Sequence, residues 1–370
     1  MLGDREDMTA SMTTRTASPT APAPTTARLA HITPNWFTTV MGTGIVAVAA
    51  AQLPVGGHGL RLLGTALWAA SVVVFVAVTV AFALHWHRHR DAARAYARHA
   101  TMAHFYGAPA MAAMTVGAGT LLYAAPIVGA TTALLTDAAL WAAGTAVGVA
   151  TLIVVGVGSL RRPDRGGPAA PTRMMSVVAP TVSASTGALL ATHIANDAVA
   201  HLILVTAAVM FATALVAGGA TAVAVFRQML RTGAPLGAAA PTVWIPLGMM
   251  GQSITASVAL GAASGSTGLH SLGVGVGVIF AGLAAATIAV AITVTARAAL
   301  RGLPFSMTWW SFTFPIGTCV TGASALGKAT GSVAVDGIAV GVFAALFVAW
   351  AVVATRTAVA MKRGDLPAAP

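Results

Sequence analysis

The sequence LLGTALWAASVVVFVAVTVAFAL, residues 62–84, is an uncharged apolar run that is long enough to cross a membrane. A helix needs about 20 mostly apolar residues to span the hydrocarbon core of a bilayer. The run does not alternate apolar with polar residues, as a strand of a membrane barrel would. It therefore predicts a transmembrane α-helix.

The composition of the whole chain extends this prediction. Of the 370 residues, 57% are hydrophobic and 8% are charged, and the mean hydropathy is +0.83. An ordinary soluble domain has about 25% charged residues and needs them to cover its surface. The composition therefore argues against a soluble enzyme, a nucleic-acid-binding module and a disordered chain, and it favours a polytopic membrane protein.

Ten apolar segments have the length of a membrane span, and we predict an all-α integral membrane protein from them. The predicted spans are 36–53, 62–84, 102–124, 134–158, 174–193, 199–226, 242–261, 271–296, 307–326 and 334–355.

The distribution of positive charge predicts the orientation of these spans. With the N-terminus in the cytoplasm, all 20 Lys and Arg residues except Arg61 and Lys328 fall in inner segments. Cytoplasmic loops of membrane proteins are enriched in Lys and Arg. We therefore predict a multi-pass protein of the cell membrane with both termini in the cytoplasm, and we attribute the net charge of +11 to topology rather than to a nucleic-acid partner.

The ends of the chain differ in composition from the spans. Residues 1–33 are rich in Thr, Ala and Pro and predict a disordered cytoplasmic tail, because they contain no apolar core of a signal peptide. Residues 34–356 form the predicted ten-helix domain, and residues 357–370 form a short basic cytoplasmic tail.

Proline and glycine divide the predicted helices into two groups. An interior proline removes a backbone hydrogen bond, and lipid cannot satisfy the freed carbonyl, so such a helix favours contact with protein or water. We therefore predict five tandem hairpins in which the odd-numbered helices form an inner layer around a central pore and the even-numbered helices face lipid. The odd helices carry Pro34 with Gly42 and Gly44, Pro109, Pro180, Pro246 and Pro315.

The predicted corridor is neutral. We find no Asp, Glu, Lys or Arg in the core of any span, which argues against a carboxylate-driven cation pump. Hydroxyl and amide groups on the odd helices are candidate donors for an anion. They include Thr38, Thr39, Thr43, Ser183, Ser185, Thr186, Gln252, Ser253, Thr255, Ser311, Thr313 and Thr318, although such hydroxyls often only bond their own backbone.

Five motifs resemble the tellurite-resistance/dicarboxylate transporter family, which includes sulfite exporters, malate permeases and slow-type anion channels. They are PNWFTTVMGTGIVA (34–47), HFYGAPAMAAMTVGAG (104–119), APTVSASTGALLA (179–191), WIPLGMMGQS (244–253) and FSMTWWSFTFPIG (305–317). The resemblance implies a homo-oligomer, often a trimer, with a pore in each chain. It also implies a phenylalanine gate, which matches Phe314, with Phe312 as the alternative. The predicted pore lining comprises Thr38, Gly42, Thr43, Pro109, Pro180, Ser183, Pro246, Gln252, Thr313 and Pro315.

The family resemblance leaves the substrate open. The stretch MGTGI (41–45) is nearer to the sulfite exporters, and the absence of an Arg fork in the spans favours small or singly charged anions. The alternative is a proton-coupled transporter of C4-dicarboxylates such as malate, in which His104 carries a proton or senses pH. A histidine in an aromatic belt at the membrane interface explains the same residue without such a role.

An enzyme is the remaining alternative. His193, Asp197 and His201 recur every four residues and could hold a metal on one helix face, but they cross a predicted helix junction, where they could simply form a polar cap. No nucleophile motif or phosphate-binding loop occurs. We therefore expect no catalysis, no cofactor and no metal, and we interpret Cys319 as inert packing.

Overall fold

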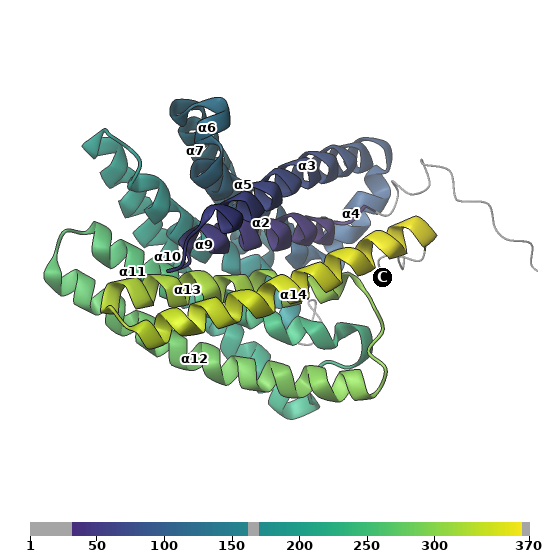
Figure 1. Ribbon diagram of the computed structural model, residues 1–370. Coiled ribbons are helices and arrows are strands. Elements are labelled where there is room, and N and C mark those ends of the chain that lie inside the picture. The colour runs from purple at the N-terminus through teal and green to yellow at the C-terminus, as the bar shows by residue number, and fades with distance from the viewer. Residues whose placement is uncertain (1–31, 162–169, 365–370) are drawn as a thin grey trace, which may run out of the picture.

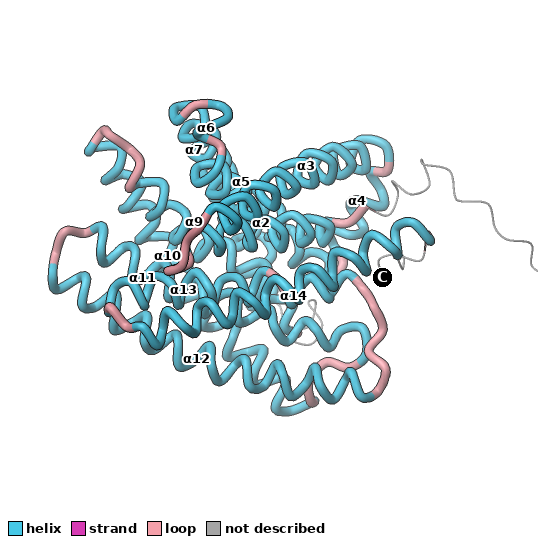
Figure 2. Tube along the Cα trace, viewed as in Figure 1, coloured by secondary structure: helices cyan, strands magenta, loops and turns pink. Residues whose placement is uncertain are grey.

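The computed structural model describes residues 32–161 and 170–364, and these residues form helices and no strands. Most of the predicted N-terminal tail, most of the inner segment 161–173 and residues 365–370 lie outside the described part of the chain. The helices are joined by short connections (Figure 2). The predicted all-α class is confirmed.

Five inner helices share one design, in which a short 3-10 segment leads into an α-helix. The pairs are η1 Pro34–Trp36 with α2 Phe37–Gln52, η2 Met102–Tyr106 with α5 Gly107–Tyr123, η5 Pro171–Met174 with α9 Met175–Ala191, η6 Gly237–Trp244 with α11 Ile245–Ala263, and η7 Met307–Phe312 with α13 Phe314–Thr330.

Five longer helices alternate with them along the chain. They are α3 His58–Arg88, α7 Ala130–Thr151 with the π-helical turn η3 Leu152–Val157 and α8 Gly158–Arg161, α10 Asp197–Thr232, α12 Thr267–Leu300, and α14 Val333–Arg363. Two short helices, α4 Arg90–Arg98 and α6 Ala125–Val128, lie in connections. Because α14 runs to Arg363, the first residues of the predicted C-terminal tail are helical.

The two groups form two layers, as the proline pattern predicts. Each inner helix contacts the next one along the chain, and α13 contacts α2, so the inner helices close into a ring. Each outer helix packs against the inner helix before it; Figure 1 shows α2 beside α3 and α13 beside α14. We compared the most apolar 18-residue window of each span. In the inner spans at 102–123, 171–191 and 237–263, 83% to 89% of these residues are buried, whereas in the outer helices only 11% to 33% are buried.

The number of spans is a separate question from the layering. Helices occupy all ten predicted ranges. Judged by length and hydropathy alone, eight of the described helices are long and apolar enough to cross a membrane. The other two inner helices, α2 and α13, have 16 and 17 residues. The count of ten therefore stays a prediction.

The prolines do not act as the sequence analysis proposed. Only Pro180 lies deep inside an α-helix, and Pro109 is the third residue of α5. Pro246 and Pro315 lie in the first turn of α11 and α13. A first-turn proline removes no intrahelical bond, because that N–H has no partner in any helix. These two prolines therefore mark the change from 3-10 to α-helix rather than a kink.

The carboxyl group of Asp137 lies inside a span, which corrects the expectation of uncharged span cores. Asp137 is fully buried on α7, two turns from its start at Ala130. Both of its carboxylate oxygens are buried without a hydrogen-bond partner in the described part of the chain. The side chain packs against Gly117 of α5, where the glycine leaves room for it.

Candidate functional site

Two cavities lie inside the ring, and all five inner segments contribute to each. The first, which we name the apolar cavity, is lined by residues near the start of each inner helix. The second, the polar cavity, is lined by residues farther along the same helices. Along α2, for example, Met41 lines the first cavity and Ile45 the second.

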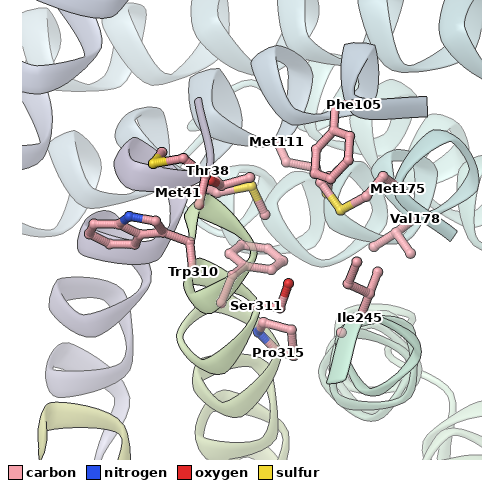
Figure 3. A pocket seen from close by; sticks show the side chains of 13 residues that line it. Thr38, Met41, Phe105, Met111, Met175, Val178, Ile245, Trp310, Ser311 and Pro315 are labelled. Atoms are coloured by element: carbon pink, nitrogen blue, oxygen red, sulfur yellow. The ribbon is translucent and has the colours of Figure 1, made fainter. Parts of the chain in front are cut away.

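The lining of the apolar cavity consists mainly of thioether, aliphatic and aromatic side chains. Phe105, Met111 and Met175 approach it from one side in Figure 3, and Trp310, Ser311 and Pro315 belong to the segment on the other side. The complete lining is Thr38, Met41, Phe105, Met111, Met175, Val178, Ile245, Gly248, Met307, Trp310, Ser311, Phe314 and Pro315.

Phe314 lies where η7 passes into α13, with its side chain against the apolar cavity. Only 3% of the residue is exposed. Pro315 follows it directly and fixes the first turn of α13. Gly248 of α11 leaves space beside the ring, because a Cβ built there would lie 3.9 Å from Phe314 Cδ1. The ring is therefore anchored at its backbone and shares the cavity lining with flexible methionine side chains.

The polar cavity has a different chemistry. Side chains with hydroxyl or amide groups reach it from all five inner helices: Gln52, Thr115, Ser185, Thr186, Gln252, Thr255 and Thr321. The other described residues of the lining are aliphatic, and none of the described lining residues is Lys, Arg, Asp or Glu. The cavity is thus a neutral chamber that offers hydrogen bonds.

Gln252 has a fixed orientation in this chamber. The Ser185 hydroxyl donates a short hydrogen bond to Gln252 Oε1, and both residues are buried. With its oxygen held by Ser185, the amide has its two N–H donors free for another partner. Across the cavity, Thr255 and Thr321 share a hydrogen bond of 3.0 Å.

The structure distributes the predicted pore residues over several environments. Thr38, Phe314 and Pro315 line the apolar cavity, and Gln252 lines the polar cavity. The others pack between helices. Gly42 lies against Thr313 and Trp310, Thr43 accepts a hydrogen bond from Trp350 Nε1 at 3.1 Å, and Ser183 contacts Thr145 and Trp141 of α7. Pro180 and Pro246 are buried in α9 and α11, and Pro109 is half-buried in α5.

Phe312 lies in a different environment from Phe314, although only one residue separates them. Its ring packs edge-on against Trp244 and Trp309, with centroids 5.8 Å away in each case. It does not belong to the lining of either cavity.

His104 is buried at the start of the second inner segment. Its Nδ1 and the Ser176 hydroxyl are 2.9 Å apart, and the same hydroxyl donates to the Arg173 carbonyl oxygen at 2.9 Å. This contact joins η2 to α9, and the His104 side chain is buried.

Of the three residues considered for a metal site, His193 lies on the connection between α9 and α10, and Asp197 and His201 lie at the start of α10. His193 and Asp197 are exposed, and Asn196 caps α10 by accepting from the Val199 N–H at 3.0 Å. Within residues 32–161 and 170–364, no group of three His, Cys, Asp or Glu side chains is placed to hold a metal ion.

Sequence reasoning missed two features of the site. Methionines from four segments surround the apolar cavity, but Met is common in any apolar core, so Met41, Met111, Met175 and Met307 gave no signal. Thr115 and Thr321 in the polar cavity were also not among the predicted lining, because membrane helices contain many threonines that only bond their own backbone.

The sequence is similar to a known family and to several known proteins over most of its length. A family model described as voltage-dependent anion channel matches residues 31–358. An uncharacterized transporter of Methanocaldococcus jannaschii is 26% identical over 91% of this chain and 95% of its own length. Sulfite efflux pumps of Arthroderma otae and Arthroderma benhamiae are 22% and 23% identical over 89% and 81% of this chain, and over 90% and 83% of their own lengths.

Proposed function

The chain belongs to the voltage-dependent anion channel family, and on that premise we propose that it exports a small anion of the sulfite type through the corridor between its five inner helices. The observation that supports this most is the closed ring of buried helices with a cavity at two levels. The long outer helices expose apolar residues such as Val73, Val154 and Val216, which suits a multi-pass membrane protein.

Phe314 is the proposed gate of this corridor. A bulky apolar ring in a narrow passage excludes water, and an ion cannot cross a dry constriction without a large desolvation cost. The neighbouring methionines can change rotamer, which would let the ring swing aside without moving the helices.

The neutral lining favours a small, singly charged substrate. A dicarboxylate needs compensation for two charges, and binding sites for carboxylates commonly use a bidentate arginine. Among the residues that the structure describes, no Lys or Arg lines either cavity. His104 is engaged with Ser176 and is not part of either lining, so it does not favour the proton-coupled dicarboxylate alternative.

The location follows from the same proposal. We place the protein in the cell membrane with both termini in the cytoplasm, so that the apolar cavity lies nearer the cytoplasm and the polar cavity nearer the outside. Assembly into a homo-oligomer, a trimer by family resemblance, is part of the proposal.

The gate is tested by sulfite and nitrate flux into proteoliposomes that contain equal amounts of protein. Phe314→Ala should raise the flux of both anions, because the substitution removes the ring from the corridor. Phe312→Ala is the matched control, since that ring packs on Trp244 and Trp309 outside the cavities. Unchanged flux in the Phe314 variant would contradict the gate, and increased flux in the Phe312 variant alone would move the gate to that residue.

A further inference from the structure

We propose that the polar cavity binds a monoprotonated oxyanion, an anion that carries one negative charge and still has an O–H group, such as hydrogen sulfite. This inference rests on the proposed function and adds the protonation state of the transported species. It follows from the donors and acceptors that the cavity presents and from the absence of positive charge in its lining.

The hydroxyl protons of the cavity already have partners in the protein. Thr115 donates to the Met111 carbonyl oxygen at 2.7 Å, and Thr186 donates to the Val182 carbonyl oxygen at 2.7 Å. Thr321 donates to the Thr318 carbonyl oxygen at 3.0 Å. A hydroxyl has one proton and two lone pairs, so these groups can offer only acceptor lone pairs to a ligand in the cavity.

The two remaining hydroxyls are engaged in the same way. Ser185 has two acceptors within reach, Gln252 Oε1 and the Val182 carbonyl oxygen at 3.0 Å. Thr255 has the Gly251 carbonyl oxygen at 3.3 Å and the Thr321 hydroxyl at 3.0 Å. Turning any of these protons toward a ligand would break a bond worth about 0.5–1.5 kcal/mol.

The donors of the cavity are therefore amide N–H groups. Gln252 is 4% exposed, and its oxygen is held by Ser185, so its N–H groups are the ones left for a ligand. Gln52, at the end of α2, adds a second amide to the lining. The cavity thus combines amide donors with hydroxyl acceptors.

The charge of the lining limits the charge of the ligand. The cost of moving an ion out of water rises with the square of its charge, so a dianion costs about four times as much as a monoanion of the same size. In the described part of the chain, no Lys or Arg lines the polar cavity to offset that cost. A singly charged ligand is therefore favoured over the doubly charged sulfite ion.

Hydrogen sulfite fits both conditions. Its unprotonated oxygens can accept from the Gln252 amide, and its O–H can donate to a threonine hydroxyl oxygen. Nitrate and chloride can use the amide but have no proton to give, and fully ionised sulfite places a second charge against the lone pairs. The match requires no change in the hydroxyl orientations.

The proposal is tested with the full-length protein in proteoliposomes, with protein-free liposomes as the blank for passive leak of sulfur dioxide. Uptake of sulfite and of nitrate is measured at constant total concentration from mildly acidic to mildly alkaline pH. Sulfite flux should fall in proportion to the protonated fraction of sulfite, while nitrate flux stays constant. Sulfite flux that is independent of pH, or that rises with pH, would overturn the proposal.

Substitutions separate this effect from a general loss of transport. Thr321→Val and Thr115→Val each remove one acceptor with little change in shape, and either should reduce sulfite flux relative to nitrate flux by about 2- to 10-fold. Thr287→Val is the control, because Thr287 is buried on α12 outside both cavities and bonds the Leu283 carbonyl oxygen. An unchanged sulfite-to-nitrate ratio in both acceptor variants would refute the assignment, whereas absence of flux for every anion would refute the proposed function itself.

Discussion

Trp141 shows how a single side chain joins the two layers. Its indole N–H donates to the Ser183 carbonyl oxygen at 2.9 Å, which links α7 to the inner helix α9. Its ring covers Gly187, where a Cβ would lie 2.9 Å from the indole. The residue is 8% exposed, so both the hydrogen bond and the ring contact lie inside the protein.

Trp141→Phe should therefore destabilise the protein by about 1–3 kcal/mol, because it removes a buried hydrogen bond and part of a packed ring. The measurement is the free energy of unfolding in detergent micelles on titration with a denaturing detergent. Trp309→Phe is the matched control, since Trp309 bonds the Pro304 carbonyl oxygen at an exposed site. Equal losses in the two variants would contradict a structural role for the Trp141 bond.

Individual residues show how far the sequence can predict the site. Gln252 could be named because an amide is rare in an apolar run, but its bond to Ser185 joins residues on different helices. Phe314 was assigned by family resemblance, since the residues alone do not distinguish it from Phe312. Asp137 was missed because it lies near the end of its predicted span, and only the packing against α5 shows that it is buried.

At the scale of the helix, small residues set the distance between the layers. Gly144 of α7 lies so close to α5 that a Cβ would be 2.8 Å from the Ala110 carbonyl oxygen and 2.6 Å from Met114 Cγ. Gly148, one turn later, lies against Ala179 of α9. Their four-residue spacing places both glycines on the face of α7 that meets the inner ring, as is typical of close contacts between membrane helices.

Gly144→Ala should therefore destabilise the protein by about 1–3 kcal/mol, because the Ala110 backbone has to move away from the added methyl group. Gly219→Ala on α10 serves as the control, because nothing lies within 4 Å of a Cβ built there. The control should leave stability unchanged or raise it by up to about 1 kcal/mol, as alanine is the better helix former. Denaturing-detergent titration measures both, and a loss confined to the Gly219 variant would contradict the packing argument.

The 3-10 segments before the inner helices were not predictable from the sequence. Apolar periodicity gives the length and burial of a helix but not its exact hydrogen-bond pattern, and the two helix types share side-chain preferences. The prolines did identify which helices are inner. The predicted role of these prolines as interior kinks was partly wrong, because Pro246 and Pro315 lie in the first turn of their helices.

At the scale of the whole molecule, alternation along the chain becomes layering in space. Each inner helix is followed by an outer helix that returns to the starting side, so the five inner helices run in the same direction and can close into a ring. The sequence could predict the layers because lipid-facing and protein-facing helices differ in proline, glycine and polar content. It could not predict the two cavities, which depend on how side chains from five helices meet.

The positively charged residues are distributed unequally between the two ends of the inner helices. Among the described residues, Arg61 and Lys328 are the Lys and Arg residues on the side where the inner helices end, and the others lie on the side where the inner helices begin. By the enrichment of Lys and Arg in cytoplasmic segments, the side where the inner helices begin should be the cytoplasmic side.

Labelling of single cysteines in intact cells with a membrane-impermeant maleimide tests this orientation. The chain has one cysteine, Cys319, which is buried, so a Cys319→Ala parent removes the background. Arg61→Cys, at the exposed start of α3, should react in intact cells. Arg231→Cys, at the exposed end of α10, should react only after permeabilisation. The two positions are matched, because each replaces an exposed arginine near a helix end. The reverse labelling pattern would show that the topology is inverted and that the polar cavity lies on the cytoplasmic side of Phe314.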